Sequence, residues 1–184
     1  ILLGGQRCIM QIPLLSPLRN RNFSLFWIGF TLSLVTNVSF LFAITIEGYR
    51  LTGSETAAGA IVSLHQIPML AFMLFAGVLT DRISRRLTII VVNLMRSGLL
   101  FIVVALMKTE VLQIEHLYIV TFLFGMVNTF DWPARLGLLP ALVKSENIVA
   151  ANSLLSFASR GATVGGAVLG SRLIQEASIS DAIL

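Results

Sequence analysis

Four charged side chains interrupt long apolar runs of this sequence: Arg96, Asp131, Arg135 and Arg160. A carboxylate and a guanidinium that leave water together can neutralise each other, and a carboxylate can also exchange a proton or meet a charged ligand. Arg135 lies four residues after Asp131, so both side chains share one face of a helix. The pattern predicts a cluster in which Asp131 neutralises one or more arginines. The sequence does not determine which of Arg96, Arg135 and Arg160 pair with it.

Composition defines the elements that hold these charges. The chain has 184 residues, 56% of them hydrophobic and 12% charged, with a mean hydropathy of +0.89. A soluble domain carries about 25% charged residues, so the composition indicates a membrane protein. The net charge of +4 comes from Lys and Arg that lie mainly between the apolar runs. This placement indicates membrane topology rather than nucleic-acid binding.

Five apolar runs approach or exceed the roughly 20 residues that cross a bilayer. Short polar turns join them, which predicts an all-α, polytopic membrane helix bundle over residues 23–175. A cytoplasmic segment over residues 1–22 precedes it and a truncated loop over residues 176–184 follows. The fourth run is the weakest because Asp131, Pro133 and Arg135 interrupt it. The expected spans cover about residues 23–47, 56–80, 87–107, 117–140 and 148–173.

The interrupting charges share a depth in these spans. Arg96 is nine residues past Leu87, and Asp131 is nine before Pro140. Arg160 lies a similar distance into the fifth span, so all three are roughly 13–15 Å from one face. A charge inside the membrane costs at least about 2.5–3.5 kcal/mol on insertion scales, so such residues face a cavity or one another.

The cluster has two interpretations. In the first it is structural, and the charges only satisfy one another. In the second Asp131 exchanges partners with a substrate or carries a proton. A neighbouring guanidinium favours the ionised carboxylate, so proton transfer would require Asp131 to separate from arginine during the cycle.

Other polar residues lie inside the first two spans. Asn37, His65 and Gln66 either form hydrogen bonds within the bundle or line a substrate pathway, and His65 titrates near neutrality in water. The sequence contains one cysteine, no metal-ligand spacing and no phosphate-binding loop. We therefore expect neither an enzyme nor a bound metal or cofactor.

The turn between the second and third spans carries a motif, Gly77-Val-Leu-Thr-Asp81-Arg82-Ile-Ser-Arg85-Arg86. With the N-terminus in the cytoplasm, seven Lys and Arg residues fall on the cytoplasmic side and three on the other, as the positive-inside rule requires. The motif then lies on the cytoplasmic side. Its G-x-L-x-D-R-x-x-R-R pattern resembles the loop signature of the major facilitator superfamily of secondary transporters, with Ser84 in place of the usual glycine.

A second stretch narrows the resemblance to one branch. Pro133-Ala134-Arg135, Leu138-Leu139-Pro140 and Asn152-Ser153-Leu154 look like the drug and siderophore exporters, which include enterobactin exporters and macrolide efflux proteins. The resemblance runs from about Leu18 to Leu173. It implies export of small amphipathic molecules across the inner (plasma) membrane by alternating access, coupled to protons or another ion.

The resemblance also assigns roles and exposes departures. It implies that the Gly77–Arg86 loop is a conformational gate, in which Asp81 caps a helix of the other half and Arg85 bridges to an acid. Relatives usually carry that acid where Ala141 stands, and they often have a proline in the fifth span that is missing here. The family has about twelve spans, so five correspond to part of its N-terminal half. The remaining half is an implied partner, beside the lipid bilayer, a small-molecule substrate and a coupling ion.

Glycines mark one face of the fifth span. Gly161 and Gly165 form one small-x-x-x-small pair, and Gly166 and Gly170 form another. Such pairs predict close helix packing inside the bundle, with homodimerisation as the alternative. Two other functions remain open for the whole chain: a non-transporting membrane module or truncated product, and a transporter-like domain of a lipid-handling fusion enzyme.

Overall fold

The computed structural model describes residues 15–182, except for the side chains of residue 81 and of residues 173–182. Nearly all of this part is helical, and it contains no strand. The expected all-α bundle is confirmed. A short 3-10 turn, Ser16–Arg19, precedes the first helix, and a second, Ser145–Asn147, precedes the last one. The long helices are α1 Arg21–Thr52, α2 Glu55–Arg82, α3 Arg85–Lys108, α4 Ile114–Leu142 and α5 Ile148–Ala182.

Local sequence explains why the helices begin and end where they do. Gly53 adopts a left-handed φ of 64° and ends α1, a conformation that costs glycine little. The side chain of Ser54 then accepts a hydrogen bond from the backbone N–H of Ala57 and starts α2. Ser84 starts α3 in the same way, by accepting from the backbone N–H of Leu87. The α1–α2 and α2–α3 turns are therefore short because each contains its own cap.

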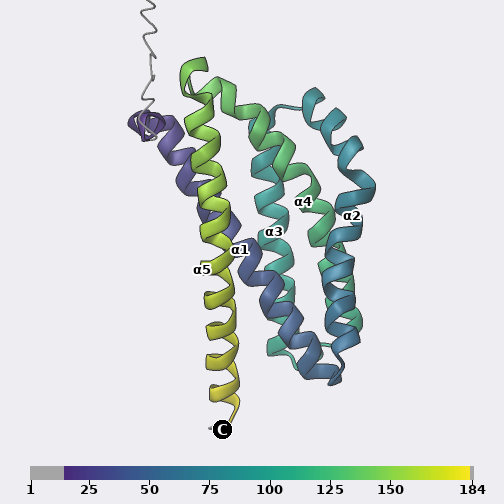
Figure 1. Cartoon of the computed structure of the whole chain (residues 1–184). Helices are drawn as coiled ribbons and strands as arrows, with labels where there is room; N and C mark the ends of the chain where they lie inside the picture. Colours follow the sequence, from purple (N-terminus) through teal and green to yellow (C-terminus); the bar gives the residue numbers. More distant parts are fainter. Residues whose placement is uncertain (1–14, 183–184) are drawn as a thin grey trace, which may run out of the picture.

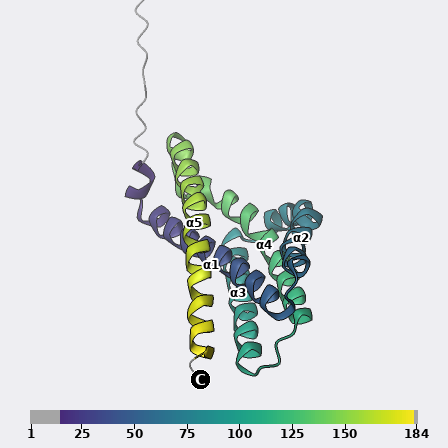
Figure 2. The ribbon, with the colours of Figure 1, turned by 60° about the horizontal axis from the view of Figure 1, so that its bottom comes forward.

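The helices alternate in direction and form two closely packed pairs. α2 lies along α4, and α1 crosses α5 obliquely before it reaches the start of α2 (Figure 1). α3 packs mainly on α4, and a turned view keeps this arrangement (Figure 2). The start of α1, the α2–α3 turn and the α4–α5 turn therefore lie at one end of the bundle.

Two separate apolar clusters hold the bundle together, one toward each end. The first joins α1, α4 and α5 through Phe23, Phe30, Leu139, Ala151, Leu154, Leu155 and Ala158. The second joins α1, α2, α3 and α4 through Phe40, Ile44, Ile61, Val103, Leu117, Val120 and Phe124. Polar side chains occupy the middle, between the clusters.

Many large apolar side chains point outward from the helices. Among the described residues, α1, α2 up to Thr80, and α3 are long and apolar enough to cross a membrane. α4 does not meet the same criterion, since Asn128, Asp131 and Arg135 lie within it. α5 does not meet it either. By hydropathy alone, three of the five expected spans are supported, and the assignment of α4 and α5 as spans stays a prediction.

Candidate functional site: a buried charge cluster

Side chains from α1, α3 and α4 meet in the middle of the bundle. Arg96 Nη2 on α3 lies 3.1 Å from Asp131 Oδ2 on α4, and Arg135 Nε lies 2.8 Å from Asp131 Oδ1. Both arginines also donate to the hydroxyl of Ser33 on α1, at 2.9 Å and 3.1 Å. Ser33 Oγ in turn lies 3.4 Å from Asn93 Oδ1 on α3. One carboxylate and one hydroxyl thus connect three helices.

All three charged groups are withdrawn from solvent. Arg96, Asp131 and Arg135 are 7%, 8% and 3% exposed. Each oxygen of Asp131 accepts from a different arginine, so the carboxylate is shared rather than bound by one bidentate fork. Two guanidinium groups against one carboxylate leave the cluster with one uncompensated positive charge. Breaking such a buried pair costs several kcal/mol, about 3–5, because the remaining charge stays buried.

Aromatic rings complete the surroundings of the two arginines. The Arg135 guanidinium lies 5.2 Å from the centre of the Phe30 ring, and that of Arg96 lies 6.0 Å from the Phe124 ring. Rings at this distance stabilise a cation through their quadrupole. The sequence interpretation did not include Phe30, Ser33 or Phe124 in the site. One signal was present, since Phe30 and Ser33 are three residues apart on one face of α1.

Arg160 is outside this cluster, which corrects the depth argument for that residue. It is exposed on α5, whereas the face of α5 that packs on the bundle carries Ala151, Leu155, Ala158 and Ala162. Arg160 follows Ala158 by two residues, which turns it about 200° around the helix axis. Arg160 therefore does not contact Asp131, because its side chain lies on the exposed face of α5 and not on the face that packs on the bundle.

A second polar contact joins α2 to α4. His65 Nε2 lies 3.0 Å from Asn128 Nδ2, and His65 Nδ1 lies 3.2 Å from Gln66 Oε1. His65 is buried while Gln66 is exposed. Asn128, which the sequence interpretation did not select, is the interhelical partner. The contact matches the hydrogen-bonding alternative for His65, and a role in a pathway stays a prediction.

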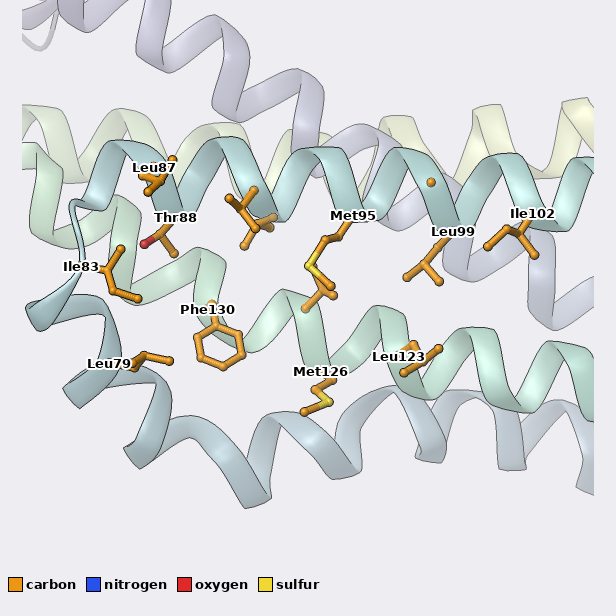
Figure 3. Close-up of a pocket in the computed structure, with 14 residues that line it drawn as sticks. Leu79, Ile83, Leu87, Thr88, Met95, Leu99, Ile102, Leu123, Met126 and Phe130 are labelled. Atoms are coloured by element: carbon orange, nitrogen blue, oxygen red, sulfur yellow. The ribbon is translucent and has the colours of Figure 1, made fainter.

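Two cavities of different chemistry lie on opposite sides of α3. One, of about 290 Å³, is lined by Asn37 together with Gly29, Ser33, Thr36, Asn93, Arg96 and Ser97. The other, of about 540 Å³, is lined by apolar side chains of α2, α3 and α4, among them Ile83, Met95, Met126 and Phe130 (Figure 3). Polar groups therefore gather on the side of the charge cluster, and the far side of α3 has almost none.

The loop motif lies at the end of the bundle where α2 passes into α3. Arg82 and Arg86 are exposed, and Asp81 belongs to α2 with its side chain outside the described part. Arg85 Nη1 donates to the backbone carbonyl of Gly137, near the C-terminus of α4. A Cβ at Gly77 would meet no described atom within 4 Å, so no helix of the described chain packs tightly on it.

Comparison with known proteins bears on the whole bundle. The family model described as Major Facilitator Superfamily matches residues 24–180. The chain belongs to the major facilitator superfamily, a family of membrane transporters. A search of curated proteins and a search of solved structures gave no match. The superfamily match covers all five helices, the charge cluster and the loop, so the resemblance at the superfamily level is confirmed.

The four glycines of the predicted small-x-x-x-small pairs in α5 differ in how closely other atoms approach them. A Cβ at Gly166 would press on the Val38 side chain, and one at Gly170 would contact the Ser39 carbonyl. Gly161 and Gly165 have no neighbour within 4 Å of such an atom. The 166/170 pair therefore serves close packing of α5 on α1, and the 161/165 pair faces open space in the described chain. Among the described residues no group of three His, Cys, Asp or Glu side chains is placed to hold a metal ion.

Proposed function

We propose that this chain forms part of a secondary active transporter that exports small amphipathic molecules by alternating access, with protons as the coupling ion. One observation carries the proposal: a superfamily helix bundle contains a buried carboxylate that shares its two oxygens between arginines of two helices. Ionisable groups inside a membrane bundle are expensive, and they mark ion and substrate pathways.

The two ion pairs of Asp131 differ in how easily motion would break them. Arg135 lies one turn away on the same helix, so that pair survives any rigid movement of α4. Arg96 belongs to α3, so a shift of α3 against α4 would separate it from Asp131. Loss of the Arg96 contact would leave Asp131 Oδ2 free for another partner. In the proposed cycle Asp131 takes up a proton in the state where Arg96 has moved away.

The loop would act as the gate at the cytoplasmic end. Arg85 links the start of α3 to the last turns of α4 through the Gly137 carbonyl. In the proposed gate Asp81 caps a helix of the other half of the transporter, whose N-terminus would stabilise the carboxylate, and the exposed Arg82 and Arg86 lie beside it in the chain. Contacts made in only one access state bias the equilibrium between states.

The arrangement of charge supports an orientation for this multi-pass protein. Arg19, Arg21, Arg82, Arg86 and Lys144 lie at the end of the bundle that holds the α2–α3 turn. The opposite end carries Arg50, Lys108 and Arg172. We assign the first end to the cytoplasm and the protein to the inner (plasma) membrane, with the remaining half of the transporter as its partner.

A test compares dye retention in cells that lack the gene and in cells that carry it back. Both a cationic dye, ethidium, and an anionic dye, fluorescein, are followed as the external pH changes. The restored gene is expected to lower retention of at least one dye, and Asp131→Asn to abolish the pH dependence. Arg160→Gln, a charge change on an exposed face, is the matched control and should behave like the wild type.

Two results would contradict the proposal. If cells with the gene and cells without it retain each dye equally, the protein does not export such molecules. Unchanged, still pH-dependent export by the Asp131→Asn variant removes the carboxylate as the proton carrier while leaving transport itself in place.

A further inference from the structure

The charge cluster has a donor that no partner in the bundle satisfies. Arg96 Nε is buried and has no hydrogen-bond partner among the described residues. The Arg96 side chain is only 9% exposed, so water reaches little of it. A buried donor without a partner costs about 1–3 kcal/mol, more where the group is charged. The other donors of Arg96 already reach Asp131 and Ser33.

The charge of Arg96 is also incompletely neutralised. Arg135 donates to one oxygen of Asp131 and Arg96 to the other, so neither arginine has the carboxylate to itself. Glu47, the other buried acid of the described residues, pairs with Arg50 near the far end of α1. Among the side chains that the structure describes, the middle of the bundle therefore holds one more positive charge than negative charge.

Arg96 lines a cavity that has room for a small group. The cavity measures about 290 Å³ and combines hydroxyl and amide side chains with the aromatic ring of Phe124. Its polar lining consists of Ser33, Thr36, Asn37, Asn93, Arg96 and Ser97. The Ser33 and Thr36 hydroxyls already donate to Asn93 Oδ1 and to the Leu32 carbonyl. Arg96 Nε and the amide and hydroxyl donors of Asn37, Asn93 and Ser97 suit an oxyanion, because each can supply a charge-assisted hydrogen bond.

The depth of the cavity selects the source of such an anion. Ser33 is twelve residues into α1, so it lies roughly 18 Å along the helix from Arg21. The cavity is thus between the two apolar clusters and away from the helix ends, where lipid head groups lie. A small molecule that enters the bundle fits this position better than a head group does.

We propose that the cavity beside Arg96 is a subsite for the anionic group of the substrate, a carboxylate in a small amphipathic acid. The inference rests on the proposed transport function and adds the charge of the molecule carried. Arg96 binds the anion, while Asp131 and Arg135 hold the Arg96 guanidinium in place. Molecules of similar size with an ammonium group are excluded by the surplus positive charge.

Equilibrium binding separates this subsite from transport. The purified chain, in nanodiscs of phosphatidylcholine, is titrated with 4-fluorobenzoate and with 4-fluorobenzylammonium, and binding is followed by fluorine NMR. The wild type is expected to bind the benzoate about tenfold or more tightly than the ammonium probe, as one charge-assisted hydrogen bond predicts. Arg96→Gln should abolish that preference, and Arg160→Gln should retain it.

A second variant keeps the ion pairs intact. Gly29 lines the cavity, and a Cβ there would meet no described atom within 4 Å. Gly29→Leu should therefore fold and fill the cavity, and it should weaken benzoate binding about tenfold or more. This variant decides the matter if Arg96→Gln does not fold.

Three outcomes would overturn the subsite. They are equal binding of the two probes, a preference for benzoate that survives both Arg96→Gln and Gly29→Leu, and displacement of benzoate by phosphatidylglycerol added to the nanodiscs. Benzoate binding that follows the expected pattern without any dye export in cells would instead support the subsite and count against the proposed export.

Discussion

Met95 and Arg96 are neighbours in the sequence, yet they lie on different sides of α3. Arg96 pairs with Asp131 and lines the polar cavity of about 290 Å³. Met95 lines the apolar cavity of about 540 Å³ between α2, α3 and α4, which we call the apolar groove. The charge cluster and the apolar groove both use side chains of α3, and they lie at the same position along that helix. The difference shows that direction around the helix axis decides whether a side chain enters a charge network or an apolar surface.

The largest difference in stability between the charge cluster and the apolar groove is expected when one side chain of each is truncated to alanine. Asp131→Ala leaves two guanidinium groups buried without a counter-charge, and it should lower the free energy of unfolding by about 3–5 kcal/mol. Met126→Ala in the groove should cost less, because Met126 is 36% exposed. Unfolding in mixed micelles, followed by circular dichroism, gives both values. A smaller loss for Asp131→Ala than for Met126→Ala would contradict the comparison.

A second comparison removes one hydroxyl group from the charge cluster and one from the apolar groove. Ser33→Ala deletes the acceptor shared by Arg96 and Arg135 and should cost about 1.5–3 kcal/mol, the range for hydrogen bonds to charged groups. Thr88 lines the groove, and its hydroxyl donates to the carbonyl of Ser84, the residue that caps α3, at 3.4 Å. Thr88→Ala should change stability by less than about 0.5 kcal/mol. Equal effects in the same micelle assay would remove the special status of Ser33.

Glycines allow the same contrast between a crowded face and an open one. A Cβ at Gly125 would collide with the backbone carbonyl of His65, so Gly125→Ala forces α2 and α4 apart. Overpacking of this kind costs about 1–3 kcal/mol. Gly161→Ala meets open space and should be neutral or stabilising by up to about 1 kcal/mol, through helix propensity. Thermal unfolding measures both, and a destabilised Gly161→Ala would indicate a contact that the single chain does not show.

A small effect is expected where a neutral polar contact joins two helices. Asn128→Leu removes the hydrogen bond to His65 and also removes a buried Asn128 oxygen that has no partner among the described residues. Interhelical hydrogen bonds in membranes average about 0.6 kcal/mol. The change should therefore stay within about 1 kcal/mol in the same unfolding assay. A loss comparable with that of Asp131→Ala would make the His65 contact as important as the ion pairs.

Hydropathy and short polar turns were enough to predict an all-α bundle. Gly53, Ser54 and Ser84 end and begin helices through caps that depend only on neighbouring residues. The superfamily followed from the Gly77–Arg86 motif, and the match over residues 24–180 confirms it. The exporter branch, the substrate and the coupling ion stay predictions.

The charge cluster was only partly accessible from the sequence. The pairing of Asp131 with Arg135 follows from one helical turn, and the sequence fixes it as soon as α4 forms. The choice of Arg96 over Arg160, and the entry of Ser33, Phe30 and Phe124, depended on how α1, α3, α4 and α5 are rotated about their own axes. That rotation comes from long-range packing of the two apolar clusters, for which no short sequence pattern gives the angle. The sequence by itself thus determined the helices and the depth of the charges, and the tertiary structure decided which of them meet.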